Sequence, residues 1–475
     1  MKGNGSGRVL LVNPVPLYGG SRTGGRTLTP PSLVSLFSFL VAHGVAVEVL
    51  DLHVELGSPR TLEDVSKVAA KSAEVVLRHD FDVLAISCNS SFHFLGTVDL
   101  AQRLRTADSS VPIVVGGCHV SAAPDDFLGA EAPFDYVVTG EGELALLELA
   151  RSPRRATCPE VVSGKPLPLD KVWLDLAGYP YLPSRPHRAM FPLSRGCPNR
   201  CAFCGGMSRS GWRAYPPDQA FEVLRRLLAV RPETVGFGDA CFGLHRPWRR
   251  AFLSRLADLE LGVPIWWETR VNAVDQVDLD LIAKMEMRLE LGVETMSPRM
   301  VEVMRKAHDG TAYVRRTQSL LEELHRRRVL TEVALLVNHP GEDAASLRAT
   351  VDYFRGFASS HPRTTVYAKG HAFMYLPGTG VAADRERLAQ EYGTRIGHPR
   401  WWHEAAFQGP LADDVCASHD ELDPDAAVSE LFRLRGATVM GMPVEAKLLW
   451  RRFRAPLRVM FDGAEPRTGQ PPRQD

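Results

Sequence analysis

Cys197, Cys201 and Cys204 are the residues whose type and spacing most clearly indicate chemistry. They form the motif CPNRCAFC, in which three thiols lie within eight positions. Three thiolates on one short loop can surround a single cubane iron–sulfur cluster. The motif has no fourth ligand nearby, so one iron would lack a protein ligand. Such an open iron could bind a small molecule and split it reductively.

Two other interpretations of this motif stay open from the sequence. A structural zinc site would normally complete its tetrahedron with a fourth cysteine or histidine nearby. Alternatively, the three thiols could be incidental. A disulfide framework is not expected, because the cytosol keeps thiols reduced. The remaining cysteines occur singly, as Cys88, Cys118, Cys158, Cys241 and Cys416.

Length and composition limit the kind of protein this is. A chain of 475 residues with 45% hydrophobic residues can bury at least two cores, so we expect two domains and a tail. Its formal net charge is zero, without the basic surplus that nucleic acid requires. No apolar run of about 18 residues occurs, and the beginning MKGNGSGRVLLVNPVP lacks a signal-peptide pattern. We therefore expect a cytoplasmic protein that binds neither nucleic acid nor membrane.

Residues 1–157 alternate between apolar strand-like runs and helical stretches. Helices are expected over residues 32–43 and 97–105. This alternation is typical of a doubly wound parallel sheet in the α/β class. The expected strands are RVLLV, VAVEVLD, FDVLAIS, PIVVGG and FDYVVTGEGE.

A proline-rich segment over residues 158–190 interrupts this pattern and is interpreted as a linker. A second alternation over residues 191–380 predicts a partial, (β/α)6-type parallel barrel, whose chemistry would lie at the carboxyl ends of its strands. Residues 381–475 are expected to form a small, α-rich C-terminal region that caps the substrate. The six expected barrel strands are FPLSRG, ETVGFGD, PIWWETR, RLELGVE, LTEVALLVN and TTVYAKGHAF. The cysteine motif directly follows the first of them.

With these segments in place, the chain resembles the radical S-adenosylmethionine (SAM) enzymes. RGCPNRCAFC is similar to the cluster loop of that family, with Phe203 as its aromatic residue, and GFGDACF, WWETRVN, LGVETMSPRMVEVMRK, LLVNHPGED and AFMYLPGTG follow in the expected order. The resemblance implies a 4Fe-4S cluster on Cys197, Cys201 and Cys204. Its unique iron would chelate SAM, and one electron would release a 5′-deoxyadenosyl radical that abstracts hydrogen from an unactivated carbon.

The same resemblance implies roles for residues at strand ends. Asp239 would lie near the amino group of the methionine moiety, although a helix cap is the alternative. Arg270 and Glu294 would contact the carboxylate and ribose, although a salt bridge at the barrel rim would also explain them. Residues 338–341 would lie against adenine, but Asn338 and His339 stand where small or apolar residues are common.

The first domain resembles the cobalamin-binding domain of one large branch of this superfamily. LVNPVP, VEVLD, LAIS, VVGGCH and VTGEGE carry the likeness, with Ser87, Gly116 and Gly117 at strand ends where a macrocycle or its nucleotide tail could approach. His53 is not expected to ligate cobalt, because its spacing is one residue too long and it follows the second strand. Residues 14–25 would instead cover the lower face. Some relatives keep this domain without the cofactor.

Two further features of the sequence have both a functional and a plain interpretation. Cys241 follows Asp239 by two residues and could give a hydrogen atom or proton to an intermediate, but a buried, inert thiol is the alternative. The turn Glu141-Gly142-Glu143 could suggest a metal site. In the matching family turn, however, it leads into a helix, where acids favour the first-turn dipole.

Three functions are compatible with these expectations. The first is cobalamin-assisted C-methylation of a small secondary-metabolite intermediate, of the antibiotic or aminoglycoside type. The second is diol dehydration, deoxygenation or epimerisation with an empty first domain, as in the radical diol-dehydratase of apramycin-type aminoglycoside biosynthesis. The third is a cobalamin- or cluster-dependent sensor. Either enzyme would need an external electron donor such as flavodoxin or ferredoxin, and either could use a downstream reductase.

Overall fold

The computed structural model describes most of the chain up to residue 404. The described residues are 7–17, 30–57, 59, 62–107, 110–172, 174–176, 178–181, 188–205, 211–259, 261–285, 287–404, 416–419, 422, 438–439 and 442–443. Most of the expected C-terminal region over residues 381–475 and most of the loop expected to cover the cobalamin face lie outside these residues.

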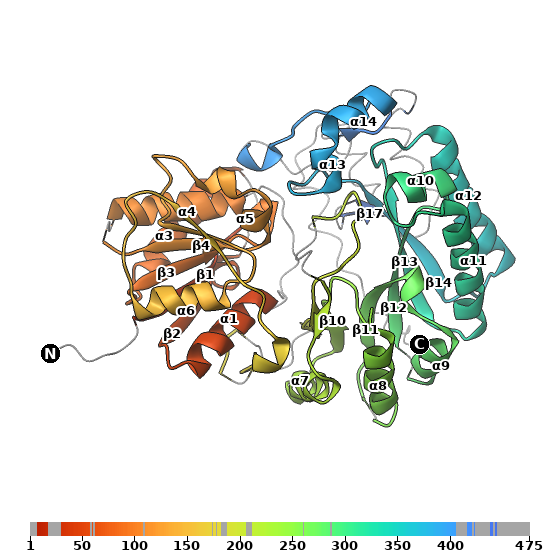
Figure 1. Ribbon diagram of the computed structural model, residues 1–475, viewed down its shortest axis with the longest axis horizontal. Coiled ribbons are helices and arrows are strands. Elements are labelled where there is room, and N and C mark those ends of the chain that lie inside the picture. The colour runs from red at the N-terminus through yellow and green to blue at the C-terminus, as the bar shows by residue number, and fades with distance from the viewer. Residues whose placement is uncertain are drawn as a thin grey trace, which may run out of the picture.

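The first domain is a six-stranded parallel sheet with helices on both faces (Figure 1). Its strand order is β2-β1-β3-β4-β5-β6, and every neighbouring pair is parallel. The strands are β1 Val9–Asn13, β2 Val47–Asp51, β3 Val83–Ser87, β4 Ile113–Gly116, β5 Tyr136–Thr139 and β6 Glu160–Ser163. Helices α1 Pro31–Ala42 and α6 Glu143–Arg151 pack together, as do α3 Leu62–Val76 and α4 Phe94–Ala107, and shorter helices are α2 Leu52–Leu56 and α5 Cys118–Ala122. This arrangement confirms the predicted doubly wound sheet.

The central strands are buried along their whole length. All five residues of β1 (VLLVN) and of β3 (VLAIS) are buried. Continuous apolar strands are typical of a parallel sheet covered by helices on both faces, because neither side of the strand meets water. The carboxyl ends of these strands therefore form one edge at which polar residues can gather.

The second domain is an open barrel of six parallel strands, which confirms the predicted (β/α)6 type. Its order is β14-β13-β12-β11-β10-β7, with the helices on the outside (Figure 1). The strands are β7 Arg188–Met190, β10 Thr234–Phe237, β11 Ile265–Arg270, β12 Arg288–Glu294, β13 Leu330–Val337 and β14 Val366–Ala372. The helices are α7 Pro217–Ala229, α8 Arg246–Leu256, α9 Gln276–Lys284, α10 Pro298–Val303, α11 Gly310–Arg326 and α12 Ala344–Ser360.

The first barrel strand lies earlier in the chain than the sequence suggested. FPLS was expected to be that strand, but β7 ends at Met190, and residues 191–193 run into a short hairpin. Phe191 and Leu193 are buried without belonging to a strand, and burial of this kind produces an apolar run that imitates one. Both β6 and β7 lie within residues 158–190, the expected linker, so this segment contributes one strand to each sheet.

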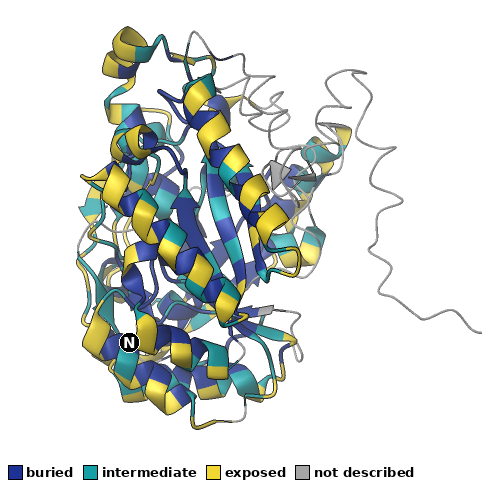
Figure 2. Cartoon of the chain, turned by 90° about the vertical axis from the view of Figure 1, so that its right-hand side faces the viewer, coloured by how far each residue is buried: buried dark blue, intermediate teal, exposed yellow. Residues whose placement is uncertain are grey.

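The two sheets share their hydrophobic cores. One cluster of buried residues contains residues from strands of both sheets, among them Leu11 of β1 and Leu291 of β12. A second cluster joins β1, β3 and α4 to residues that follow the barrel, among them Tyr375, Trp401 and Trp402. Helices α13 Gly380–Ala383 and α14 Arg385–Tyr392 belong to the start of the C-terminal region and lie above the sheets in Figure 1. In Figure 2 the strands are buried and the helices expose their outer sides. No helix in the described part of the chain is long and apolar enough to cross a membrane.

Candidate functional site

The three cysteines lie on a loop held by a two-stranded hairpin. The hairpin consists of β8 Ser194–Arg195 and β9 Arg213–Ala214, which pair in antiparallel fashion. We call residues 196–212 between them the cysteine loop, of which 196–205 and 211–212 are described. Cys201 is buried, Cys197 is half-buried and Cys204 is exposed. The three cysteines of this loop thus differ in their exposure to solvent.

Backbone hydrogen bonds attach the middle of the cysteine loop to the barrel and to the C-terminal region. The N–H of Ala202 donates to the carbonyl of Met304, just after α10, at 2.8 Å. The carbonyl of Ala202 accepts from the N–H of Val381 in α13 at 2.9 Å. A side chain on Gly380 would lie 3.1 Å from the Cα of Ala202, so this approach favours glycine. Residues 304 and 381 were not predicted from the sequence, because backbone contacts leave no residue signature.

Two of the thiols accept hydrogen bonds from polar side chains. The side-chain amide of Asn199 donates to Sγ of Cys197 at 3.2 Å, and Nη1 of Arg270 donates to Sγ of Cys201 at 3.0 Å. Such bonds stabilise thiolates and help to set the potential of an iron–sulfur cluster. No group of three Cys, His, Asp or Glu side chains among the described residues is arranged around a single metal ion. Three thiolates with no fourth ligand in the motif match a cubane, which takes one thiolate per iron and leaves one iron open.

A chain of contacts leads from Cys201 into the barrel. Nη2 of Arg270 donates to the carbonyl of Lys306 at 2.6 Å. The Lys306 ammonium in turn lies 3.0 Å from Oε1 of Glu294 and 3.0 Å from the carbonyl of Gly292. Its Nζ is also 5.8 Å from the centroid of the Phe203 ring. Glu294 therefore forms a salt bridge, as the alternative interpretation expected, whereas Arg270 contacts Cys201 and backbone.

Lys306 is a site residue that sequence reasoning did not single out. Its side chain is only 3% exposed, although lysine is among the residues least often buried. The carboxylate of Glu294 raises the pKa of Lys306 against the effect of burial, so the buried amine keeps its proton. The RK pair in LGVETMSPRMVEVMRK was the only signal that could have pointed to it.

Glu294 and Asn338 share an uncommon backbone conformation at the carboxyl ends of neighbouring strands. Their φ angles are +70° and +64°, in the left-handed region that favours glycine. The pairing of β12 with β13 also shifts register between Gly292 and Glu294. Irregularities of this kind redirect side chains, and they concentrate at functional sites. Both residues are therefore turned by local strain at the edge where the cysteine loop lies.

Asp239 contacts the segment that enters the cysteine loop. Its carboxylate accepts from the N–H of Leu193 at 3.1 Å and from the hydroxyl of Ser194. Burial raises the pKa of Asp239 to about 7. It is not the cap of α8, since His245 occupies that position. The observed contacts position the loop, and a contact between Asp239 and SAM stays a prediction.

Cys241 is enclosed in the core. The residue is 2% exposed, and its thiol lies 4.0 Å from the hydroxyl of Thr269. Burial raises the pKa of Cys241 to about 12, so its thiol keeps its proton at neutral pH. This environment favours the inert thiol over a reactive one.

The inner wall of the barrel is polar. Alternate residues of a strand share a face, so Glu268 lies on the same side of β11 as Arg270. Glu268 in β11 is the pairing partner of Glu290 in β12, and Glu290 is the pairing partner of Glu332 in β13. Glu332 accepts hydrogen bonds from Lys369 at 2.8 Å and from the hydroxyl of Tyr367 at 3.0 Å. A hydrophilic molecule would meet hydrogen-bonding groups along this wall.

The carboxyl edge of the first sheet brings the predicted small residues together. Ser87 pairs directly with Gly116 across β3 and β4. A Cβ on Gly116 would meet nothing closer than 3.5 Å, whereas one on Gly117 would lie 2.6 Å from the carbonyl oxygen of Cys88. Gly117 also has a φ of +123°. The fold thus requires glycine at 117, whereas a Cβ at Gly116 would make an ordinary van der Waals contact with Val138.

His53 lies on α2 after β2, and the preceding Asp51 has a structural task. The Asp51 carboxylate accepts from the N–H groups of His53 at 3.1 Å and Val54 at 3.2 Å, which caps α2. It also accepts from the Asn13 amide at 3.0 Å. These contacts give Asp51 a structural role at the start of α2, and the absence of a bond between His53 and cobalt stays a prediction.

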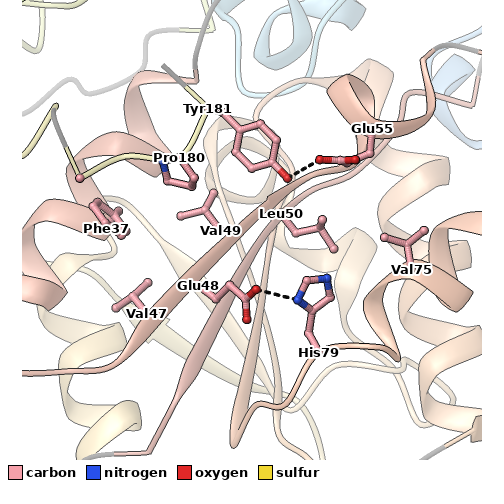
Figure 3. Close-up of a pocket in the computed structure, with 11 residues that line it drawn as sticks. Phe37, Val47, Glu48, Val49, Leu50, Glu55, Val75, His79, Pro180 and Tyr181 are labelled. Atoms are coloured by element: carbon pink, nitrogen blue, oxygen red, sulfur yellow. Dashed lines mark hydrogen bonds and ion pairs between the residues drawn. The ribbon is translucent and has the colours of Figure 1, made fainter. Parts of the chain in front are cut away.

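A cavity of about 570 Å³ lies along the edge strand β2 (Figure 3). Tyr181 covers it and donates to Glu55 at 2.8 Å, while His79 contacts Glu48 at 2.8 Å. Because β2 is at the opposite edge of the sheet from β5 and β6, this cavity is separate from the cysteine loop, whose hairpin contacts the turn after β5. We do not include it in the site.

Both domains match known protein families. Residues 22–150 match the B12 binding domain, and residues 191–354 match the radical SAM superfamily. The chain is 25% identical over 325 residues to an uncharacterized methyltransferase of Pyrococcus horikoshii, covering 63% of this chain and 68% of that protein. It is 27% identical over 369 residues to the cobalamin-dependent radical SAM methyltransferase TokK of Streptomyces tokunonensis, covering 68% of this chain but about half, 51%, of TokK.

A solved structure shares the two-domain fold. The radical SAM methyltransferase TsrM from Kitasatospora setae, with cobalamin and a [4Fe-4S] cluster bound, superposes with a TM-score of 0.64 at 18% identity. The match covers 92% of both chains. At this identity the likeness supports the fold alone.

Proposed function

We propose that this chain, a radical SAM enzyme with a B12-binding domain before the radical core, is a cobalamin-dependent methyltransferase acting on an unactivated carbon of a small molecule. One observation carries the proposal: the cysteine loop lies between the carboxyl edge of the first sheet and that of the barrel. Arg195 in β8, directly before the loop, contacts Glu141 after β5 at 3.0 Å, while Ala202 in the loop contacts Met304 after α10. Methyl transfer needs a radical site and a methyl carrier close together, and contacts from one hairpin and its loop to both domains support such an arrangement.

The cysteine loop and its surroundings would hold the cluster and SAM. Cys197, Cys201 and Cys204 are the proposed ligands, and the hydrogen bonds to Cys197 and Cys201 fit this assignment. Glu294 and Lys306 lie beside Phe203, where a polar ligand could exchange its contacts with theirs. When bound, the cluster supplies the electron that cleaves SAM, and cobalamin carries the methyl group.

The first domain would hold cobalamin at its carboxyl edge without a histidine ligand to cobalt. Ser87 and Gly116 are paired there, and a Cβ at Gly116 would make only an ordinary van der Waals contact with Val138. The match to the B12 binding domain and the TsrM structure with cobalamin bound support cobalamin binding by this domain.

The substrate is proposed to be a hydrophilic secondary metabolite. The polar wall of Glu268, Glu290 and Glu332 favours hydrogen-bonding groups over an apolar surface. A second curated relative points the same way: a 2-(S-pantetheinyl)-carbapenam-3-carboxylate methyltransferase of Streptantibioticus cattleyicolor is 29% identical over 193 residues, 35% of this chain and 28% of that protein. A flavodoxin or ferredoxin would supply the electron.

Product analysis after anaerobic reconstitution tests the proposal. The enzyme with iron, sulfide, cobalamin and SAM should convert a candidate substrate to a product heavier by one methyl group. S-adenosylhomocysteine and 5′-deoxyadenosine should form with it, because one SAM gives the methyl group and another the radical. A product lighter by one water, formed equally well without cobalamin, would show that the enzyme is a dehydratase and not a methyltransferase. Absence of 5′-deoxyadenosine would favour a sensor.

A further inference from the structure

Two arginines stand opposite each other at the base of the cysteine loop. Arg195 in β8 and Arg213 in β9 are direct partners in the antiparallel hairpin. Their side chains are only 19% and 23% exposed, so water screens their charges incompletely. Like charges directly opposite each other destabilise a strand pair. A hairpin with two residues in each strand has little other support.

One carboxylate of the first domain lies between these arginines. Oε2 of Glu141 is 3.0 Å from Nη1 of Arg195, and Oε1 of Glu141 pairs with Nη2 of Arg213. The Glu141 side chain is 13% exposed. Because a single carboxylate binds both cations, it converts a repulsive pair into a bridged one. Glu141 therefore closes the base of the loop that carries the three cysteines.

Neighbouring contacts fix Glu141 and its partners to three parts of the chain. Glu143, at the start of α6, lies 2.8 Å from Nη2 of Arg195 and accepts from the hydroxyl of Ser35 in α1 at 2.8 Å. The N–H of Leu167, in the connection after β6, donates to Glu141 at 3.1 Å. The two acids of the Glu141-Gly142-Glu143 turn thus form a contact with the hairpin of the cysteine loop. The sequence suggested a helix start for this turn, and the ion pairs with the hairpin come in addition to that role.

We propose that Glu141 is a positioning residue for the iron–sulfur cluster: it holds both ends of the cysteine loop against the first domain and so fixes the loop for cluster and SAM binding. The inference rests on the proposed function, since the loop must carry a cluster. It adds that a residue of the first domain, the proposed cobalamin-binding domain, fixes the loop that carries the three proposed cluster ligands. The bridge between Arg195 and Arg213 supplies the physical reason.

Replacing Glu141 by glutamine tests the bridge, because the change keeps the volume and removes the charge. The matched control is Glu222→Gln, which removes a carboxylate paired with Arg225 and Arg226 on the outside of α7. Each protein is reconstituted with iron and sulfide, and the rate of iron loss to a chelator is measured. E141Q should lose iron about tenfold faster than the wild type, whereas E222Q should match the wild type.

The double variant E141Q/R213Q separates positioning from general damage to the fold. Removing Arg213 as well ends the repulsion with Arg195, so the double variant should lose iron more slowly than E141Q. General damage predicts the reverse, because two changes would add. The change in the electron paramagnetic resonance spectrum of the reduced cluster on adding SAM gives a second readout. It should be weakened or heterogeneous in E141Q and largely restored in the double variant.

The outcomes distinguish this inference from the proposed function. If the wild type binds no cluster, the proposed function fails. If the wild type binds the cluster but E141Q loses iron and responds to SAM as E222Q does, the inference is overturned while the function stands. A double variant that loses iron faster than E141Q would also contradict the bridge.

Discussion

Arg270 donates a hydrogen bond from Nη1 to Sγ of Cys201 at 3.0 Å and a second one from Nη2 to the carbonyl of Lys306 at 2.6 Å. One guanidinium thus joins a proposed cluster ligand to the loop that presents the Lys306–Glu294 pair. Because β11 fixes the backbone of Arg270, the position of this contact is set by the barrel.

Arg270→Gln should lower the reduction potential of the cluster. Reduction adds negative charge, and a cationic donor beside a thiolate stabilises the reduced form. Its loss should shift the midpoint potential downward by roughly tens of millivolts, with Arg270→Lys in between. Redox titration followed by electron paramagnetic resonance measures the shift, and Arg250→Gln, which alters a pair with Asp275, is the control. An unchanged potential in R270Q would show that Arg270 only packs against the loop.

Glu342 should make stability depend on pH. It is 1% exposed, and burial raises its pKa from 4.5 to about 8, although it accepts a hydrogen bond from the N–H of Asn338 at 2.5 Å. A pKa raised by folding contributes stability below the unfolded value, and this contribution is lost as the pH rises through the folded value. Stability should therefore fall between pH 4.5 and about 8.

Glu342→Gln isolates this group from others that titrate nearby. The amide cannot ionise, so the free energy of unfolding of the variant does not fall with pH through this group. The difference in unfolding free energy, variant minus wild type, should therefore be at least ~1 kcal/mol larger at pH 8 than at pH 4.5. Thermal or denaturant unfolding at the two pH values measures the change. Equal differences at both values would show that Glu342 does not titrate in this range.

Gly116 and Gly117 should respond differently to alanine. At Gly117 a Cβ would meet the Cys88 carbonyl oxygen at 2.6 Å, so G117A should destabilise the first domain by roughly 1–3 kcal/mol. Gly129 is a matched control, with a φ of +127° and no atom within 4 Å of its would-be Cβ. G129A should therefore unfold at a higher denaturant concentration than G117A. Equal midpoints would remove the steric argument.

Gly116→Ala tests the cobalamin edge without this clash. Its Cβ fits at 3.5 Å from its nearest neighbour, so the unfolding midpoint should stay near that of the wild type. Cobalamin bound after reconstitution, measured by absorbance, should fall if the cofactor approaches the backbone there. Unchanged cobalamin content in G116A would place the cofactor away from this residue.

Cys241→Ala should leave the chemistry in place. The thiol is buried and protonated, and methyl transfer needs no hydrogen donor from the protein. The variant should lose ~1–2 kcal/mol of stability through the small cavity, while 5′-deoxyadenosine and product continue to form. If 5′-deoxyadenosine forms but the product does not, Cys241 is the hydrogen or proton donor that the sequence also allowed.

The sequence predicted both sheets because their strands are apolar runs of the expected length between helical stretches. It misplaced the first barrel strand, since Phe191 and Leu193 are buried in a connection that alternates like a strand. It also missed β6, whose residues EVVS are mostly exposed at the sheet edge and lie in a proline-rich segment. A pattern of apolar residues indicates which residues are buried, and residues of a connection can be buried as well as those of a strand.

The candidate site was predictable where residues lie close in the sequence or match a motif. The cysteine loop is such a case. The contacts that fix it are not, because Arg195 and Arg213 are separated from Glu141 by 54 and 72 residues, and any of many acids could have been their partner. Lys306 was missed for the same reason: its burial beside Glu294 becomes visible only once β12 and the residues after α10 are placed together.

The formation of 5′-deoxyadenosine by reconstituted protein tests the central claim most directly. With iron, sulfide, SAM and a strong reductant under anaerobic conditions, the wild type should release 5′-deoxyadenosine. The variant with Cys197, Cys201 and Cys204 all replaced by alanine should bind no cluster and release none. If the wild type forms no 5′-deoxyadenosine, or if the alanine variant keeps the same iron content and activity, the account of this chain as a radical SAM enzyme is contradicted.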